Sequence, residues 1–127
     1  MVHMAEGNFD IDMQLQPSAV DGIERFVVKK TFHGALEGTG HGEMLAVRTA
    51  VEGSAAYVLI ERITGRMAGR WGSFLLRHDG LMDRQAPTQN IVVIPDSGTD
   101  GLEGLSGTMT IDAEAKHRYA FRYSCPE

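Results

Sequence analysis

The chain has 127 residues, 43% of them hydrophobic and 23% charged, which predicts one globular domain spanning residues 1–127. The formal net charge is −5 and no run of lysine or arginine occurs, which argues against a nucleic-acid-binding protein, because neutralising phosphates needs a basic surface. The longest apolar stretch, residues 55–60, is far shorter than the roughly 20 residues that span a membrane.

The N-terminal segment MVHMAEGNFD has neither the basic nor the apolar region of a secretory signal peptide. Cys125 is the only cysteine, so neither an internal disulfide nor a cysteine-rich zinc site is expected. We therefore expect a cytoplasmic protein without a membrane or nucleic-acid partner and without a metal or other cofactor.

Apolar and polar residues alternate with a period of two along much of the chain, which predicts β-strands, whereas a clear helical period is absent. In the first such segment Phe9, Ile11 and Met13 share one face, and Asp10 and Asp12 share the other. Seven or eight strands of this kind predict an all-β protein. The segments are residues 8–15, 23–32, 33–47, 55–63, 69–78, 90–94, 108–112 and 117–123.

Glycine is over-represented, with 15 glycines in 127 residues, and several lie on one strand face. Gly34, Gly38, Gly40 and Gly42 have the same parity as the apolar residues Leu36 and Met44. Because glycines on an inward face let a strand coil sharply, this pattern favours a small closed antiparallel β-barrel of about eight strands over a sandwich.

Residues 55–63 and 69–78 predict a hairpin. A two-residue loop at Met67–Ala68 places Glu61 opposite Phe74 and Tyr57 opposite His78. One face of this hairpin then points inward, while Trp71, Ser73 and Arg77 point outward. The predicted inward set is Tyr57, Leu59, Glu61, Ile63, Phe74, Leu76 and His78. Residues 78–89 (HDGLMDRQAPTQ) are predicted to form the longest loop, and Lys30, which interrupts an apolar face, is placed near the barrel rim.

Three apparent motifs are better explained by structure than by chemistry. The segment GLEGLSG lacks the spacing and the following helix of a dinucleotide site, and predicts a tight turn. His33, Glu37, His41 and Glu43 share the polar face of an amphipathic strand, so a solvated outer face is favoured over a metal site. Ser73 and His78 have opposite parity and therefore do not form a catalytic pair.

Glu61 is the strongest candidate for a functional residue, because it interrupts the apolar face of a central strand. Burial is costly for an unpaired carboxylate and raises its pKa towards that of a usable acid or base. The alternative is a structural carboxylate bonded to an arginine or tyrosine near one barrel mouth. In the predicted register His78 lies about 13 Å along the strand from the partner of Glu61, too far for contact.

The segments KTFHGALEGTG, YVLIERITGRMAGRWGSFLLRH, PDSGTDGLEGLSG and HRYAFRYS, with their spacing, resemble a known family. It is a family of small, mostly bacterial domains of unknown function, assigned to the allene oxide cyclase-like barrel, and the resemblance covers residues 25–124. Trp71 departs from the small residue more usual there. The resemblance implies the barrel fold but no activity, since architecture alone does not establish function.

These observations predict a soluble β-barrel that binds a small apolar or aromatic ligand in its interior. One alternative is a cofactor-free isomerase or cyclase in which Glu61 transfers a proton. Another is a structural barrel filled by Phe26, Phe32, Phe74, Met44 and Phe121 that acts as a homo-oligomer, with Trp71 as an interface residue. The candidate ligand-binding residues are Tyr57, Glu61, His78, Tyr119 and Tyr123.

Overall fold

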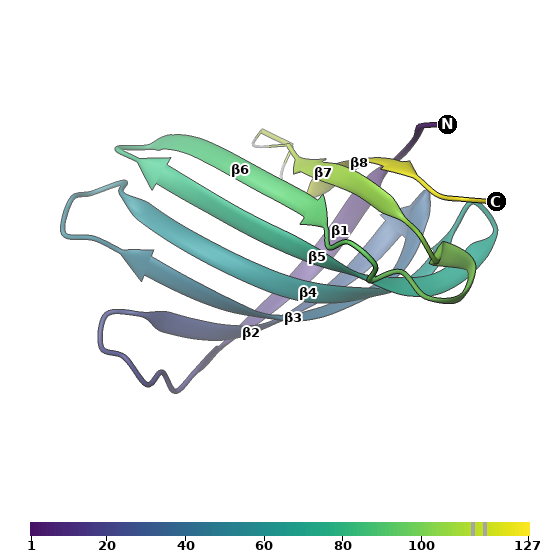
Figure 1. Cartoon of the computed structure of the whole chain (residues 1–127). Coiled ribbons are helices and arrows are strands. Elements are labelled where there is room, and N and C mark those ends of the chain that lie inside the picture. The colour runs from purple at the N-terminus through teal and green to yellow at the C-terminus, as the bar shows by residue number, and fades with distance from the viewer. Residues whose placement is uncertain (113, 116) are drawn as a thin grey trace.

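The computed structural model describes residues 1–112, 114–115 and 117–127. Eight antiparallel strands form a closed barrel in which each strand pairs with the next and the last pairs with the first (Figure 1). This confirms the predicted all-β barrel. The elements are β1 (His3–Gln16), β2 (Glu24–Gly34), β3 (Leu36–Arg48), β4 (Ala55–Met67), β5 (Arg70–Asp83), β6 (Ala86–Val93), the short 3-10 helix η1 (Asp100–Leu102), β7 (Ser106–Ile111) and β8 (Arg118–Ser124).

The predicted strand faces are confirmed. In β4 the side chains of Leu59, Glu61 and Ile63 are buried, and those of the alternate positions Val58 and Ile60 are exposed. In β5 the inward residues from Phe74 to His78 are likewise buried, whereas Trp71 is 55% exposed on the outer face. None of the helices in the described residues is long and apolar enough to cross a membrane.

The predicted register of the β4–β5 hairpin was wrong by two residues. Met67 pairs with Arg70, so the turn is Ala68–Gly69, Glu61 lies opposite Leu76, and Tyr57 lies opposite Gly80. Both turn residues have a positive φ, 52° at Ala68 and 77° at Gly69, as the tightest hairpin turns require. Glycine adopts this conformation at little cost, which favours the observed turn. Because side chains alternate with a period of two, this shift leaves every residue on its predicted face.

The long loop predicted over residues 78–89 was also wrong. Strand β5 continues to Asp83 and β6 begins at Ala86, so only Arg84 and Gln85 form the turn between them. Their φ angles are 48° and 75°, a conformation that non-glycine residues seldom adopt. The sequence gives no Asn-Gly or Asp-Gly signal at this turn, and the polar residues around it resemble a loop.

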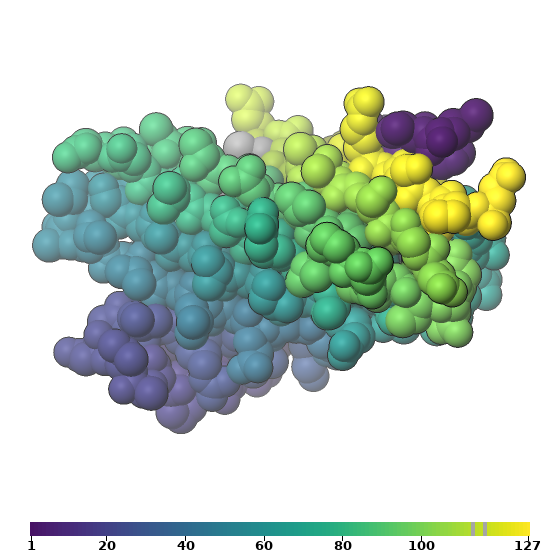
Figure 2. Space-filling view, viewed as in Figure 1, coloured from purple at the N-terminus to yellow at the C-terminus, as the bar shows by residue number. Residues whose placement is uncertain are grey.

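The strands that form the barrel extend further at one end than at the other. Strand β8 pairs with β1 only over His3–Asn8, so the second half of β1 extends past β7 and β8. Strands β2 to β6 also extend at this end, where their loops project from the barrel (Figure 1). We call it the open end. The N- and C-terminal residues lie near each other at the opposite end, as Figure 2 shows.

The inner face of β3 between Leu36 and Met44 consists of glycine alone, namely Gly38, Gly40 and Gly42. A Cβ atom at Gly42 would overlap the carbonyl oxygen of Ile60 and lie 2.7 Å from the Cβ of Glu61. This part of β3 therefore lies so close to β4 that a side chain does not fit.

We predict that Gly42→Ala lowers the free energy of unfolding by about 1–3 kcal/mol, because the added methyl group forces β3 away from β4. Thr39→Ala, on the exposed face of the same strand, is the control and is expected to change it by less than about 1 kcal/mol. Urea denaturation of both variants measures the difference. Equal stability of the two variants would contradict the close approach of the strands.

Candidate functional site: a cavity above a buried polar cluster

One half of the barrel interior is filled by packed side chains. Phe74 and Phe121 stack with their ring centroids 5.7 Å apart, and Phe32 meets Tyr119 edge-on at 5.6 Å. This half corresponds to the filled barrel considered from the sequence, but Phe26 and Met44 do not belong to it. The buried apolar residues include Phe9, Phe32, Leu36, Ile63, Met67, Phe74, Leu76, Ile91, Leu102, Tyr119 and Phe121.

The open end contains a cavity of about 440 Å³. Its walls are mainly apolar side chains from β1 to β6, among them three methionines. Tyr57, Gln89 and Thr88 supply polar groups, and Glu24 and Arg48 form an ion pair of 3.1 Å whose arginine is largely exposed. The lining residues are Met13, Glu24, Phe26, Met44, Ala46, Val47, Arg48, Ala55, Ala56, Tyr57, Gly80, Leu81, Met82, Pro87, Thr88 and Gln89.

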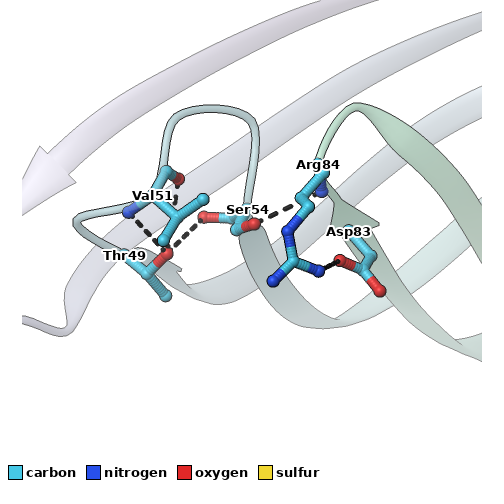
Figure 3. A network of polar contacts seen from close by, with 5 residues as sticks. All are labelled: Thr49, Val51, Ser54, Asp83 and Arg84. Carbon is cyan, nitrogen blue, oxygen red and sulfur yellow. Dashed lines mark hydrogen bonds and ion pairs between the residues drawn. The ribbon is translucent and has the colours of Figure 1, made fainter.

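Two loops beside the cavity are bonded to each other. The backbone N–H of Arg84, in the β5–β6 turn, donates to the Ser54 hydroxyl in the β3–β4 loop at 3.3 Å (Figure 3). The N–H of Gln85 donates to the carbonyl of Gly53 at 2.9 Å. Thr49 completes this network by donating to the Ser54 carbonyl at 3.2 Å (Figure 3). The network holds β3–β4 and β5–β6 together where they extend past β7 and β8.

A buried ion pair lies in the middle of the barrel. The Lys30 ammonium group donates to Oε2 of Glu61 at 2.9 Å, and the two side chains are only 5% and 1% exposed. The prediction that Lys30 sits near the rim was therefore wrong, because a partner two strands away compensates its charge inside the barrel. The pair forms across β3, where a Cβ at Gly40 would lie 3.1 Å from Oε1 of Glu61.

A second polar pair connects this region with the cavity. The Tyr57 hydroxyl and Nε2 of His78 are 2.6 Å apart, and their rings meet nearly edge-on. Tyr57 lines the cavity and its ring packs against Gly80, whereas His78 is 5% exposed. Tyr57 is therefore the residue through which the cavity contacts the buried polar groups.

Two buried atoms in this cluster have no hydrogen-bond partner among the described residues: Oε1 of Glu61 and Nδ1 of His78. Leu59 pairs with His78 and Glu61 with Leu76, so Glu61 and His78 are diagonal neighbours on the inner face. Diagonal positions are about 7–8 Å apart, which corrects the larger separation expected from the sequence. The ion pair and the Tyr57–His78 pair thus form one polar cluster.

The surroundings of this cluster favour uncharged forms of Tyr57 and His78. Burial, assisted by the Lys30 ammonium and opposed by Asp79, lowers the pKa of His78 from 6.5 to about 4. Burial also raises the pKa of Tyr57, an effect that the nearby Gln89 side chain opposes. At neutral pH both groups are therefore neutral, and the charges of Lys30 and Glu61 compensate each other.

The structure brings Tyr57, Glu61 and His78 together, but it places Tyr119 and Tyr123 in the filled half. The Tyr119 hydroxyl accepts from the Leu36 N–H at 3.0 Å and lies 2.9 Å from the His33 carbonyl, which joins β8 to the β2–β3 turn. Tyr123 stacks on Phe121 with centroids 5.3 Å apart. Neither tyrosine lines the cavity.

The histidines and glutamates on the polar face of β2 and β3 point outward, as the sequence predicts. His33, Glu37, His41 and Glu43 are all exposed, and His33 pairs with Asp10 at 2.9 Å. In the described part of the chain, no group of three or more His, Cys, Asp or Glu side chains is arranged to hold a metal ion.

Sequence reasoning missed Lys30 and Gln89 as members of the site. Lys30 breaks an apolar face, which was a usable signal, but its partner Glu61 is separated from it by a whole strand. Gln89 fell in the segment predicted as a loop, and its oxygen in fact accepts from the Ile111 N–H at 3.0 Å.

The fold and the site define a closed eight-stranded barrel with a cavity at one end and buried charges beneath it. Residues 5–123 match the family model described as "Protein of unknown function (DUF3224)", so the chain belongs to this family. The chain is also similar to a crystal structure of a DUF3224 family protein of unknown function from Shewanella oneidensis MR-1. The identity is 38%, the TM-score 0.92, and the match covers 100% of this chain and 99% of that one. A search of curated proteins found no match.

We predict that Lys30→Met destabilises the protein by about 3–5 kcal/mol, because it leaves the Glu61 carboxylate buried without its cation. The double variant Lys30→Met/Glu61→Leu is expected to recover most of this loss, since it removes both charges. Arg25→Met serves as the control because Arg25 and Glu43 form an exposed pair across β2 and β3, so its effect should stay below about 1 kcal/mol. A lower free energy of unfolding for the double variant than for Lys30→Met, measured from denaturation curves, would contradict this account.

We also predict a pH dependence of stability from His78. Its pKa of about 4 in the folded protein is below the usual 6.5, so the unfolded chain binds the proton more readily between these values. The stabilisation is complete above pH 6.5 and is lost as the pH falls towards 4, by at most about 1.4 kcal/mol per pH unit. Denaturation at several pH values should show this slope in the wild type and a smaller one in His78→Gln. Identical slopes would exclude a depressed His78 pKa.

Proposed function

We propose that this protein binds a small, largely apolar molecule in the cavity at the open end of the barrel. The cavity itself carries the proposal: its volume of about 440 Å³ falls within the range of roughly 300–1,000 Å³ typical of small-molecule sites. Apolar walls with a few polar groups are also typical of such sites, where the walls contribute affinity and the polar groups orient the ligand.

The composition of the walls supports a binding role over a packing defect. Met13, Met44 and Met82 contribute flexible side chains that adjust to the shape of a bound molecule. Met13 and Met82 are 42% and 41% exposed, so the cavity leaves apolar surface in contact with water. Covering that surface with an apolar ligand is favourable by the hydrophobic effect.

A cofactor-free isomerase or cyclase is the second candidate, and one observation favours it: Oε1 of Glu61 is buried and has no hydrogen-bond partner among the described residues. In this arrangement Glu61 does not line the cavity, and Tyr57 and His78 connect the cavity with the polar cluster. Proton transfer by Glu61 would therefore pass through these two residues. The binding function needs no such step and is the simpler proposal.

We predict that the neutral apolar probe N-phenylnaphthylamine binds the wild type with increased fluorescence and stabilises it against heat. At a free concentration 100 times its Kd, a ligand of the native state adds about 2.7 kcal/mol. Ala46→Trp, which places a large ring in the cavity, should abolish both effects. Leu45→Trp is the matched control, because Leu45 is the neighbouring residue on β3 and is 43% exposed on the outer face. Failure of the wild type to bind, or equal binding by Ala46→Trp, would contradict the proposal.

A further inference from the structure

We propose that the ligand carries an uncharged hydroxyl group, as in a phenol or an alcohol, at the end that reaches Tyr57. This inference rests on the proposed function and adds the chemical class of the ligand. It follows from which hydrogen-bonding groups at the inner end of the cavity are already used by the protein and which remain available.

The short contact between Tyr57 and His78 indicates the tautomer of His78. A neutral imidazole has one N–H and one lone pair. The Tyr57 oxygen and Nε2 of His78 are 2.6 Å apart, a separation within the usual range for an O–H donor and shorter than the usual range for an N–H donor, so the Tyr57 hydroxyl donates to Nε2. The proton of His78 therefore resides on Nδ1, and Nε2 is the acceptor.

This tautomer decides what Tyr57 offers to the cavity. Nε2 of His78 accepts the hydroxyl proton of Tyr57 across their 2.6 Å contact. Because the Tyr57 hydroxyl donates its only proton to Nε2, its oxygen can act towards the cavity only as a hydrogen-bond acceptor. Tyr57 is thus a hydrogen-bond acceptor for the ligand.

Gln89 offers the opposite group. Its side-chain oxygen already accepts from the Ile111 N–H at 3.0 Å, so its amide N–H groups remain as donors. Gln89 lines the cavity and lies across Gly80 from Tyr57, so these donors are available to the cavity beside Tyr57. An acceptor and a donor side by side match a hydroxyl group, which donates one hydrogen bond and accepts another.

The charges around the cavity disfavour a carboxylate at this position. The Lys30 ammonium is held by Glu61 at 2.9 Å and does not line the cavity. Arg48, the one cationic side chain among the lining residues, is 78% exposed and pairs with Glu24. A carboxylate at the inner end would meet the Tyr57 lone pairs without a cation, which is unfavourable in a buried site.

Four probes of similar shape test the proposal by competition with N-phenylnaphthylamine: naphthol, acetonaphthone, methylnaphthalene and naphthoate. Naphthol should bind about threefold to tenfold more tightly than methylnaphthalene, the range expected for one added hydrogen bond. Acetonaphthone, which only accepts, should fall between them, and naphthoate should bind most weakly. If methylnaphthalene binds as tightly as naphthol, or naphthoate binds best, the hydroxyl proposal is overturned while the binding function stands. If none of the four displaces N-phenylnaphthylamine, the hydroxyl proposal alone fails, and if N-phenylnaphthylamine itself does not bind, both fail.

Tyr57→Phe removes the acceptor and retains the ring. It should reduce naphthol to the affinity of acetonaphthone, because the Gln89 donor remains, and leave methylnaphthalene unchanged. Tyr123→Phe is the matched control, because it deletes a tyrosine hydroxyl in the filled half, and it should retain the preference for naphthol. A preference of naphthol over acetonaphthone that survives Tyr57→Phe would overturn the proposal.

The tautomer of His78 is also measurable directly on the wild-type protein. The nitrogen chemical shifts of the His78 imidazole distinguish the two tautomers by NMR. We expect protonation at Nδ1 near neutral pH. Protonation at Nε2 would make Tyr57 a donor to the cavity and would overturn the assignment of a hydroxyl ligand.

Discussion

The interior of this barrel depends on a strip of β3 that has no side chains. Gly38, Gly40 and Gly42 follow one another on the inner face, and a Cβ at any of them would come within about 3 Å of other atoms. The strip lets β3 approach β4 closely, and it leaves space through which Lys30 on β2 reaches Glu61 on β4. The close approach of β3 to β4 and the formation of the buried ion pair thus depend on the same three glycines.

The ion pair lies at the boundary between two halves of different character. Towards the termini, aromatic and aliphatic side chains pack into one buried cluster, and the hydrophobic effect provides the main stabilisation there. Towards the other end the strands extend past β7 and β8 and enclose a cavity. A buried ion pair adds little net stability compared with an apolar pair, because both charges lose their hydration. The filled half supplies the stability that lets the polar cluster and the cavity persist.

Alternation along the strands was sufficient to predict the fold and the direction of most side chains. Glu61 and His78 were placed on the inner face correctly even though the hairpin register was wrong, because an error of two residues preserves parity. The sequence pattern does not indicate which side chains these residues contact. Lys30 meets Glu61 across an intervening strand, and the turn at Arg84–Gln85 uses two non-glycine residues with positive φ. The cavity depends on the relative lengths of β1, β7 and β8, which no local pattern encodes.

Among the described residues, the pairing between adjacent strands is shortest between β6 and β7. In the described part of the chain, Val92 and Thr108 are the residues that place these two strands in register, and the Gln89 side chain adds a bond to the Ile111 backbone. Gln89 also faces the cavity. Under the proposed function, a ligand that engages the Gln89 amide would strengthen the pairing of β6 with β7, and slower amide hydrogen exchange along these two strands would report its binding.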